Sequence, residues 1–138
     1  MSNVQIKIER EEEFEKFLAI RDFEVTSLGE SVYKIVRGDE LPVFVNISDK
    51  TLYFEVDLGN VSEFADKDFY FKLLDLNTEI LPVSFGINNS NPDDPRLVLV
   101  ETRETKSLDD HELLCVFDAL ELAVDKAESI LSAFIKKS

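Results

Sequence analysis

The stretch that decides the fold is SLDDHELLCVFDALELAVDKAESILSAFIKK, residues 107–137. Its apolar residues recur at alternating spacings of four and three, which is the period of one helical face. That seam consists of Leu113, Phe117, Leu120, Val124, Ala127, Leu131 and Phe134, widened by Val116, Ala123 and Ile130. Ser107 followed by Asp110 resembles a capping box. The pattern predicts one continuous helix after Ser107, with a stripe wide enough to lie on a sheet.

The length of this helix raises a question about what covers its far end. Thirty helical residues span about 45 Å, whereas a strand of five or six residues spans about 17–20 Å. We therefore expect the C-terminal half, with Leu131 and Phe134, to project beyond the sheet. An exposed apolar patch of that size favours a partner. Two arrangements stay open: a second molecule in a homodimer covers it, or the N-terminal helix of the same chain does.

The rest of the chain predicts strands and two shorter helices. Period-two alternation and β-branched or aromatic residues indicate strands over 30–37, 42–48, 51–58, 83–88 and 96–103, and residues 23–29 either start the sheet or lead into it. Helices are expected over about 9–20 and from Lys67, where Asp66 or Asp68 is the cap. The order α-β-β-β-α-β-β-α predicts a single α+β domain over residues 1–138, an antiparallel sheet packed against the long C-terminal helix.

Composition excludes several classes of function. Fifteen basic and twenty-nine acidic residues leave a net charge of −14, which argues against nucleic acid and against anionic lipid surfaces as partners. No apolar run reaches the length of a membrane span, and no signal-peptide pattern follows the start. The single cysteine, Cys115, excludes an internal disulfide framework. A reducing cytoplasm is the expected location.

Residues that carry chemistry are scarce. The only histidine, His111, lies at the start of the long helix among acidic residues, and Cys115 follows it by four positions. The acidic surroundings disfavour a thiolate, so Cys115 is expected to be a small buried apolar residue and His111 a solvated one. Scattered single glycines provide no phosphate-binding loop. We therefore predict no catalytic residues, no metal and no cofactor.

Two stretches resemble known families. Residues 96–114, RLVLVETRETKSLDDHELL, together with the element order, resemble class I type III secretion chaperones; that resemblance implies a small, acidic, cytoplasmic protein that is usually a dimer. Residues 79–87, EILPVSFGI, are similar to DUF2170, a bacterial family of uncharacterised function. Some of its members are encoded near phage-shock-protein-A-like membrane-stress proteins, which implies a link to stress response, and it has no assigned catalytic residues.

These observations favour a non-enzymatic protein-interaction or chaperone-like domain that binds a protein or peptide. An extended peptide would lie on exposed strand surface or at a sheet edge. The expected partner-binding residues are Val43, Val45, Ile47 and Tyr53 on two strands, and Leu131 and Phe134 at the helix end.

Two alternatives stay open at this stage. One is a small-ligand-binding or enzymatic domain with a pocket between helix and sheet, lined by Phe85, Tyr53 and Tyr70. The other is a purely structural subunit of a larger assembly.

Overall fold

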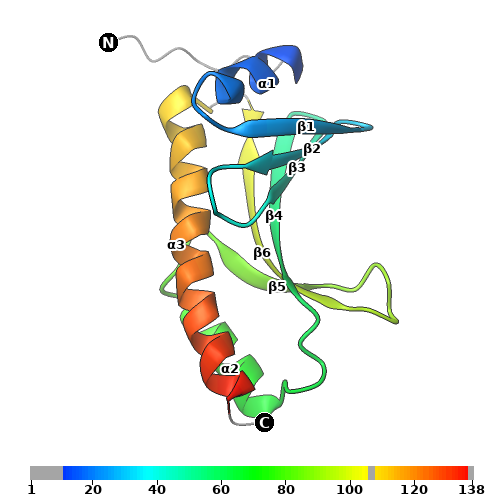
Figure 1. Ribbon diagram of the computed structural model, residues 1–138, viewed down its shortest axis with the longest axis vertical. Coiled ribbons are helices and arrows are strands. Elements are labelled where there is room, and N and C mark those ends of the chain that lie inside the picture. The colour runs from blue at the N-terminus through cyan, green and yellow to red at the C-terminus, as the bar shows by residue number, and fades with distance from the viewer. Residues whose placement is uncertain (1–10, 106–107, 137–138) are drawn as a thin grey trace.

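The computed structural model describes residues 11–105 and 108–136. Its elements in chain order are α1 (Glu11–Ala19), β1 (Glu24–Gly29), β2 (Val32–Val36), β3 (Val43–Ser48), β4 (Thr51–Gly59), α2 (Lys67–Leu76), β5 (Ser84–Asn88), β6 (Arg96–Glu104) and α3 (Asp110–Ile135) (Figure 1). The α+β class is as predicted, but β1 adds a strand to the expected order. Its alternation is weak in the sequence because most of its residues are exposed.

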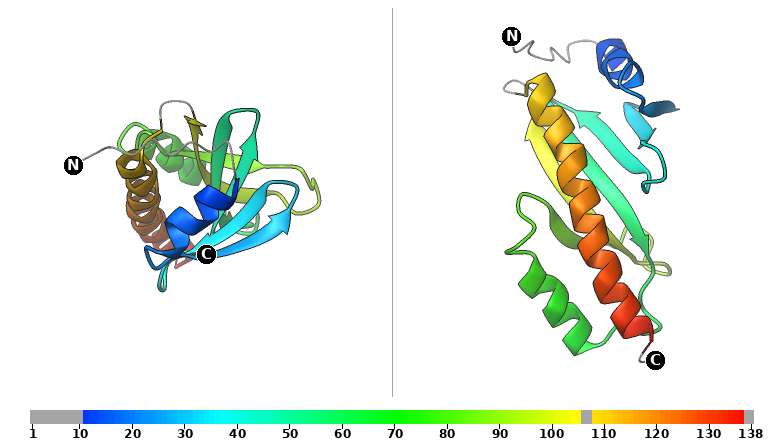
Figure 2. Two further views of the ribbon diagram at one scale, coloured as in Figure 1. Left: turned by 90° about the horizontal axis from the view of Figure 1, so that it is seen from above. Right: turned by 60° about the vertical axis from the view of Figure 1, so that its left-hand side comes forward.

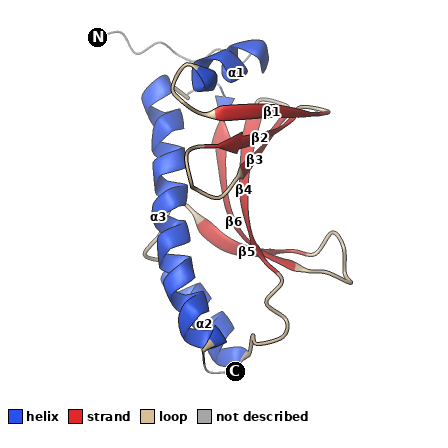
Figure 3. Cartoon of the chain, in the orientation of Figure 1, coloured by secondary structure: helices blue, strands red, loops and turns tan. Residues whose placement is uncertain are grey.

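All six strands form one antiparallel sheet in the order β1-β2-β3-β4-β6-β5. Figure 3 draws the strands in red and the three helices in blue. Glu30 and Ser31 link β1 to β2, and Asp49 and Lys50 link β3 to β4, all with positive φ. Two-residue loops of this kind match the right-handed twist of the strands that they join. The sheet therefore ends in β1 on one side and β5 on the other.

Helix α3 lies along one face of the sheet (Figures 1 and 2). Its buried residues are Leu113, Val116, Phe117, Leu120, Ala123, Val124 and Ala127, which confirms the predicted stripe over this length. The ring of Phe117 meets that of Phe54 edge-on at 5.8 Å and that of Phe23 at 4.9 Å. Each such buried phenyl ring stabilises the fold by about 1.5–3 kcal/mol.

Local hydrogen bonds set where the helices begin. Helix α3 begins at Asp110 because the side chain of Asp109 accepts from the backbone N–H of Glu112 at 2.7 Å. The expected cap, Ser107, lies outside the described residues. The predicted cap of α2 is confirmed, since Asp66 accepts from the N–H of Phe69 at 2.8 Å. Both carboxylates also lie at the positive end of a helix dipole.

The C-terminal end of α3 is covered by α2. Phe69 of α2 and Phe134 of α3 pack edge to face at 5.1 Å, and the two helices lie side by side in both views of Figure 2. The expectation that the N-terminal helix covers this end is wrong, because α1 packs at the other end, where the rings of Phe14 and Tyr33 are 5.6 Å apart (Figure 1). The loop between β4 and α2 runs to the C-terminal end of α3, where α2 begins (Figure 1).

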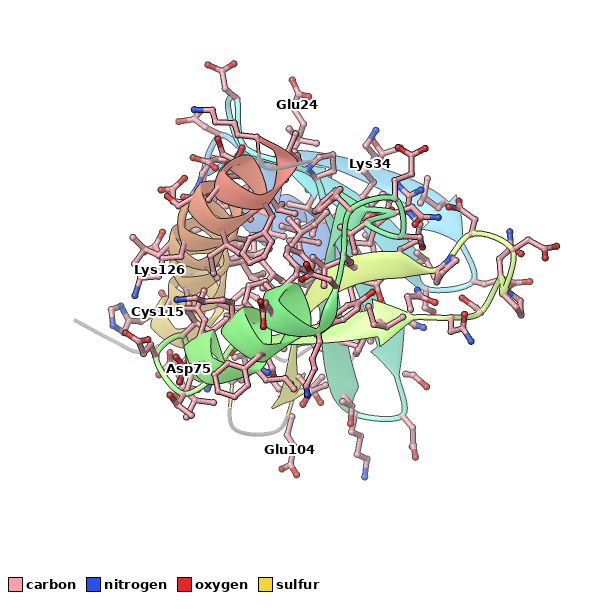
Figure 4. All side chains as sticks on the ribbon, turned by 90° about the horizontal axis from the view of Figure 1, so that it is seen from below. Glu24, Lys34, Asp75, Glu104, Cys115 and Lys126 are labelled. Carbon is pink, nitrogen blue, oxygen red and sulfur yellow. The ribbon has the colours of Figure 1, made fainter. Side chains whose placement is uncertain are left out.

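Cys115 is exposed, so the expectation that it is buried is wrong. It precedes the buried Val116 by one residue, and one residue is a rotation of about 100° around a helix. Figure 4 shows Cys115 and Lys126 on the side of α3 that points away from the sheet. His111 is exposed as expected. In the part of the chain that the structure describes, no helix is long and apolar enough to span a membrane.

Candidate functional site

The face of the sheet opposite α3 is bare of helices within the described residues (Figure 2). We call it the outer face. Residues paired across neighbouring strands share a face, and the register pairs Tyr53 with Asn46 and Thr102, and Glu55 with Phe44 and Val100. These side chains therefore belong to the outer face. It is a sheet surface on which a partner could lie.

The structure corrects part of the predicted partner surface. Val43 and Val45 are 6% and 0% exposed and belong to the core, and Ile47 is half-buried against the same core. All three point toward the helix side, so Val43 and Val45 cannot contact a partner through their side chains. The alternate set, with Phe44 half-buried and Asn46 exposed, points outward.

Tyr53 does lie on the outer face, where it is 37% exposed. Its hydroxyl donates to Oε1 of Glu55 at 2.8 Å. Asn88 of β5 donates through Nδ2 to Oε2 of the same carboxylate at 3.1 Å. Burial, and after it the hydrogen bond to Glu55, raises the pKa of Tyr53 to about 12. The phenol therefore stays a hydrogen-bond donor across the physiological pH range.

A hollow adjoins Tyr53 and Glu55, and we call it the outer-face hollow. Its lining residues are Tyr53, Glu55, Gly86, Ile87, Asn88, Asn89, Val98 and Val100. Val98 is 2% exposed and pairs with Gly86 across β5 and β6. A Cβ on Gly86 would lie 3.8 Å from Cγ2 of Val98. The backbone of Gly86 needs no positive φ, so the glycine contributes open space above Val98.

A second exposed surface lies on α2, and we call it the α2 apolar surface. Tyr70, Phe71 and Leu74 are 40%, 70% and 67% exposed. Leu74 follows Phe71 by three residues and Tyr70 by four, so it neighbours both on the surface of the helix. The buried side carries Phe69 and Leu73. A helix that is apolar on both sides is normally enclosed, and this signal in the sequence could have identified the surface.

Leu131 and Phe134, the other predicted partner-binding residues, are half-buried within this chain. Phe134 packs against Phe69 of α2, and Leu131 packs against the core of the same chain. Apolar exposure in this part of the molecule lies mainly on α2, with Ile135 at 53% exposure as the last apolar residue of α3.

The predicted pocket between helix and sheet is closed. Phe85 is buried in the core, whereas Tyr53 lies on the outer face and Tyr70 on α2, so the three do not line one cavity. A cavity beside Phe117 measures about 10 Å³, which is at most one water. Arg37 lines it and donates to Glu121 and Asp118, both at 2.7 Å.

Candidate metal or catalytic groups are few. His111 and Cys115 lie with Nε2 and Sγ 3.5 Å apart, but both are exposed on the open surface of α3. Within residues 11–105 and 108–136, no group of three or more His, Cys, Asp or Glu side chains could hold a metal ion.

Comparisons with known proteins agree with this picture of the fold. The family model CesT_Tir_1 matches residues 3–137. A chain of the heterodimeric ExoU–SpcU complex from the type III secretion system of Pseudomonas aeruginosa is similar at 18% identity and a TM-score of 0.68, covering 84% of this chain and 95% of that chain. YbjN of E. coli, for which a role as transcription regulator has been suggested, is similar at 16% identity and a TM-score of 0.62, covering 97% and 92%. No curated protein matches the sequence.

Proposed function

This chain belongs to the CesT_Tir_1 family of type III secretion chaperones, and on that premise we propose that it is a non-enzymatic, chaperone-like domain that binds a polypeptide partner in the bacterial cytoplasm. The observation that carries the proposal is the outer face, which leaves Tyr53 exposed beside a hollow. The small volume of the cavity between α3 and the sheet, about 10 Å³, supports binding over catalysis. We treat the chain as one domain.

The partner is expected to lie as an extended segment on the outer face. Such a segment gains affinity from main-chain hydrogen bonds at a sheet edge and specificity from alternate side chains placed in surface hollows. Edge strand β5 borders the outer-face hollow through Gly86, Ile87 and Asn88. An extended chain paired beside β5 can therefore direct a side chain into the hollow.

The homodimer expected for this chain would use the α2 apolar surface. Phe71 and Leu74 are each about two-thirds exposed, and exposed apolar patches on soluble domains mark interaction sites. A twofold dimer brings the same patch of both subunits together, which would bury these residues against their counterparts. Leu131 and Phe134 would then contribute to the dimer indirectly, by packing against α2 and the core within each subunit.

A role in stress response is a further part of the proposal. Its support is the similarity of residues 79–87 to DUF2170. In the structure this segment begins shortly after α2 and includes most of β5, so it lies between the two proposed interaction surfaces in the chain.

Affinity capture from the native host tests the proposed function. The tagged chain is expressed in host cells, and bound polypeptides are identified by mass spectrometry. We expect a partner at stoichiometric level, lost when Tyr53→Asp and Phe44→Asp disturb the outer face and kept when Asp125→Asn changes the exposed side of α3. Circular dichroism confirms that the variants are folded. Recovery of no stoichiometric partner, or equal recovery by all variants, would contradict the proposal.

A further inference from the structure

We propose that the outer-face hollow receives a lysine or arginine side chain of the partner polypeptide, with the Glu55 carboxylate as its counter-ion. This inference rests on the proposed function, and it specifies the chemistry of the segment that the outer face binds.

The carboxylate of Glu55 is fixed in place and has acceptor capacity left. Tyr53 donates to Oε1 at 2.8 Å, and Asn88 donates to Oε2 at 3.1 Å and to Oε1 at 3.4 Å. A carboxylate offers about four lone-pair sites, two on each oxygen. Oε1 already accepts two bonds and Oε2 accepts one, so Oε2 can accept a further bond. Two neutral donors orient the group without neutralising its charge. The geometry is that of a preformed acceptor for a cation.

No basic side chain of the described residues forms an ion pair with Glu55. Arg96, at the beginning of β6, is bound to Asp57 at 3.2 Å and to Asp94 at 3.2 Å. Arg103 is bound to the buried Glu101 at 2.7 Å. The negative charge in the hollow is therefore left for an external cation, and the net charge of −14 adds a long-range attraction for one.

The walls of the hollow suit the stem of a long basic side chain. Val98 and Val100 provide apolar surface, and Gly86 leaves the space above Val98 free. Lysine and arginine bury their methylene stems on apolar surface while the charged end meets an acceptor. The ring of Tyr53 adds a face on which a cation is attracted. A free metal ion would use none of these apolar contacts.

Synthetic peptides provide the probe. The peptide acetyl-Thr-Val-Arg-Val-Thr-amide is compared with the same peptide carrying citrulline, the neutral isostere of arginine, by titration of the ¹⁵N-labelled chain in NMR. We expect the arginine peptide to shift the amide signals of residues 53–55, 86–89 and 98–100. The citrulline peptide should bind about fivefold more weakly, the effect of one partly exposed ion pair.

Three variants give the test its specificity. Glu55→Gln should remove the preference for arginine over citrulline. Gly86→Val should fill the hollow and weaken both peptides, and Glu63→Gln, which removes one charge from an exposed loop residue, should leave the preference intact. Equal binding of both peptides to the wild-type chain, shifts confined to other residues, or equal effects of Glu55→Gln and Glu63→Gln would overturn the inference.

The peptide titration and the capture experiment fail independently. A host partner captured equally by the wild-type chain and by Glu55→Gln would contradict this inference and leave the proposed function standing. Capture of no partner, together with a clear arginine preference in the titration, would contradict the proposed function. The preference of the outer-face hollow for a basic side chain would still stand.

Discussion

Glu101 of β6 is the one polar residue that the described core encloses, at 4% exposure. Its Oε2 accepts from Nε of Arg103 at 2.7 Å, while Oε1 has no partner within the described residues. Burial raises the pKa of Glu101, and the neighbouring Arg103 opposes that rise in part. A carboxylate that is half satisfied in the core costs free energy of folding when it is charged.

The free energy of unfolding should therefore depend on pH through the ionisation of Glu101. The pKa of Glu101 is higher in the folded state than in the unfolded state. Such a group contributes to stability fully at a pH below its unfolded-state pKa, and this contribution is lost as pH rises through its folded-state pKa. We expect Glu101→Gln to raise the free energy of unfolding at pH 7 by about 1 kcal/mol, and the gain to vanish in acid. Urea unfolding at pH 7 and pH 4 measures this, with the exposed Glu104→Gln as control. A gain that does not change with pH would contradict the account.

Tyr53 offers a second test at this scale. Glu55→Gln removes the charged acceptor of its hydroxyl, so the pKa of Tyr53 should fall from about 12 toward its ordinary value of 10.0. Burial, the larger cause, remains, and the fall should be partial. Titration of the ¹³C signals of the Tyr53 ring follows the change. A Tyr53 pKa that stays at its wild-type value would show that the Tyr53 hydroxyl does not form a hydrogen bond with Glu55.

Among the elements, α3 is the one that the sequence predicted best, because the spacing of its seven seam residues fits a helix with one apolar side. The side of β3 that faces the helix was predicted wrongly, although Asn46 and Ser48 alternate with Val43, Val45 and Ile47 and so indicate the apolar side. The cover of the C-terminal end of α3 depends on where β4 ends in space, which no local pattern contains. The outer-face hollow escaped prediction because Glu55, Gly86 and Val98 belong to three different strands.

Arg37, just after β2, ties the sheet to α3. It bonds Asp118 and Glu121 at 2.7 Å, and its guanidinium lies 4.9 Å from the centre of the Phe23 ring. Arg37→Ala should lower the free energy of unfolding by about 1–2 kcal/mol, since it removes two ion pairs and the packing of the side-chain stem. Chemical denaturation measures the loss, with the exposed Lys34→Ala of β2 as the matched control. Equal stability of both variants would show that Arg37 contributes nothing to the α3 contact.

The two faces of the sheet differ in what covers them. All three helices lie around one face and build the core, and the other face stays open (Figure 2). The sequence predicted this α+β architecture through the order of its elements, although its count was one strand short. What it could not give was the location of exposed apolar surface, because exposure follows from tertiary packing. Phe71 and Phe69, two residues apart, are 70% and 0% exposed.

Oligomeric state tests the α2 apolar surface at this scale. We expect the wild-type chain to be a dimer in light-scattering measurements and the double change Phe71→Ser and Leu74→Ser to give a folded monomer, because both side chains are exposed in the single chain. The change Leu28→Ser, at an exposed apolar residue of β1, should leave the dimer intact. A monomeric wild-type chain, or a dimer that survives the double change, would contradict this assignment.

The central claim is that the open outer face of the sheet binds a polypeptide, and site-specific photo-crosslinking in host cells tests it most directly. A benzophenone amino acid is placed at Tyr53 on the outer face or at Asp125 on the exposed side of α3. The account predicts a crosslinked partner polypeptide from position 53 and none from position 125. Crosslinks from position 125 alone, or from neither position, would contradict it.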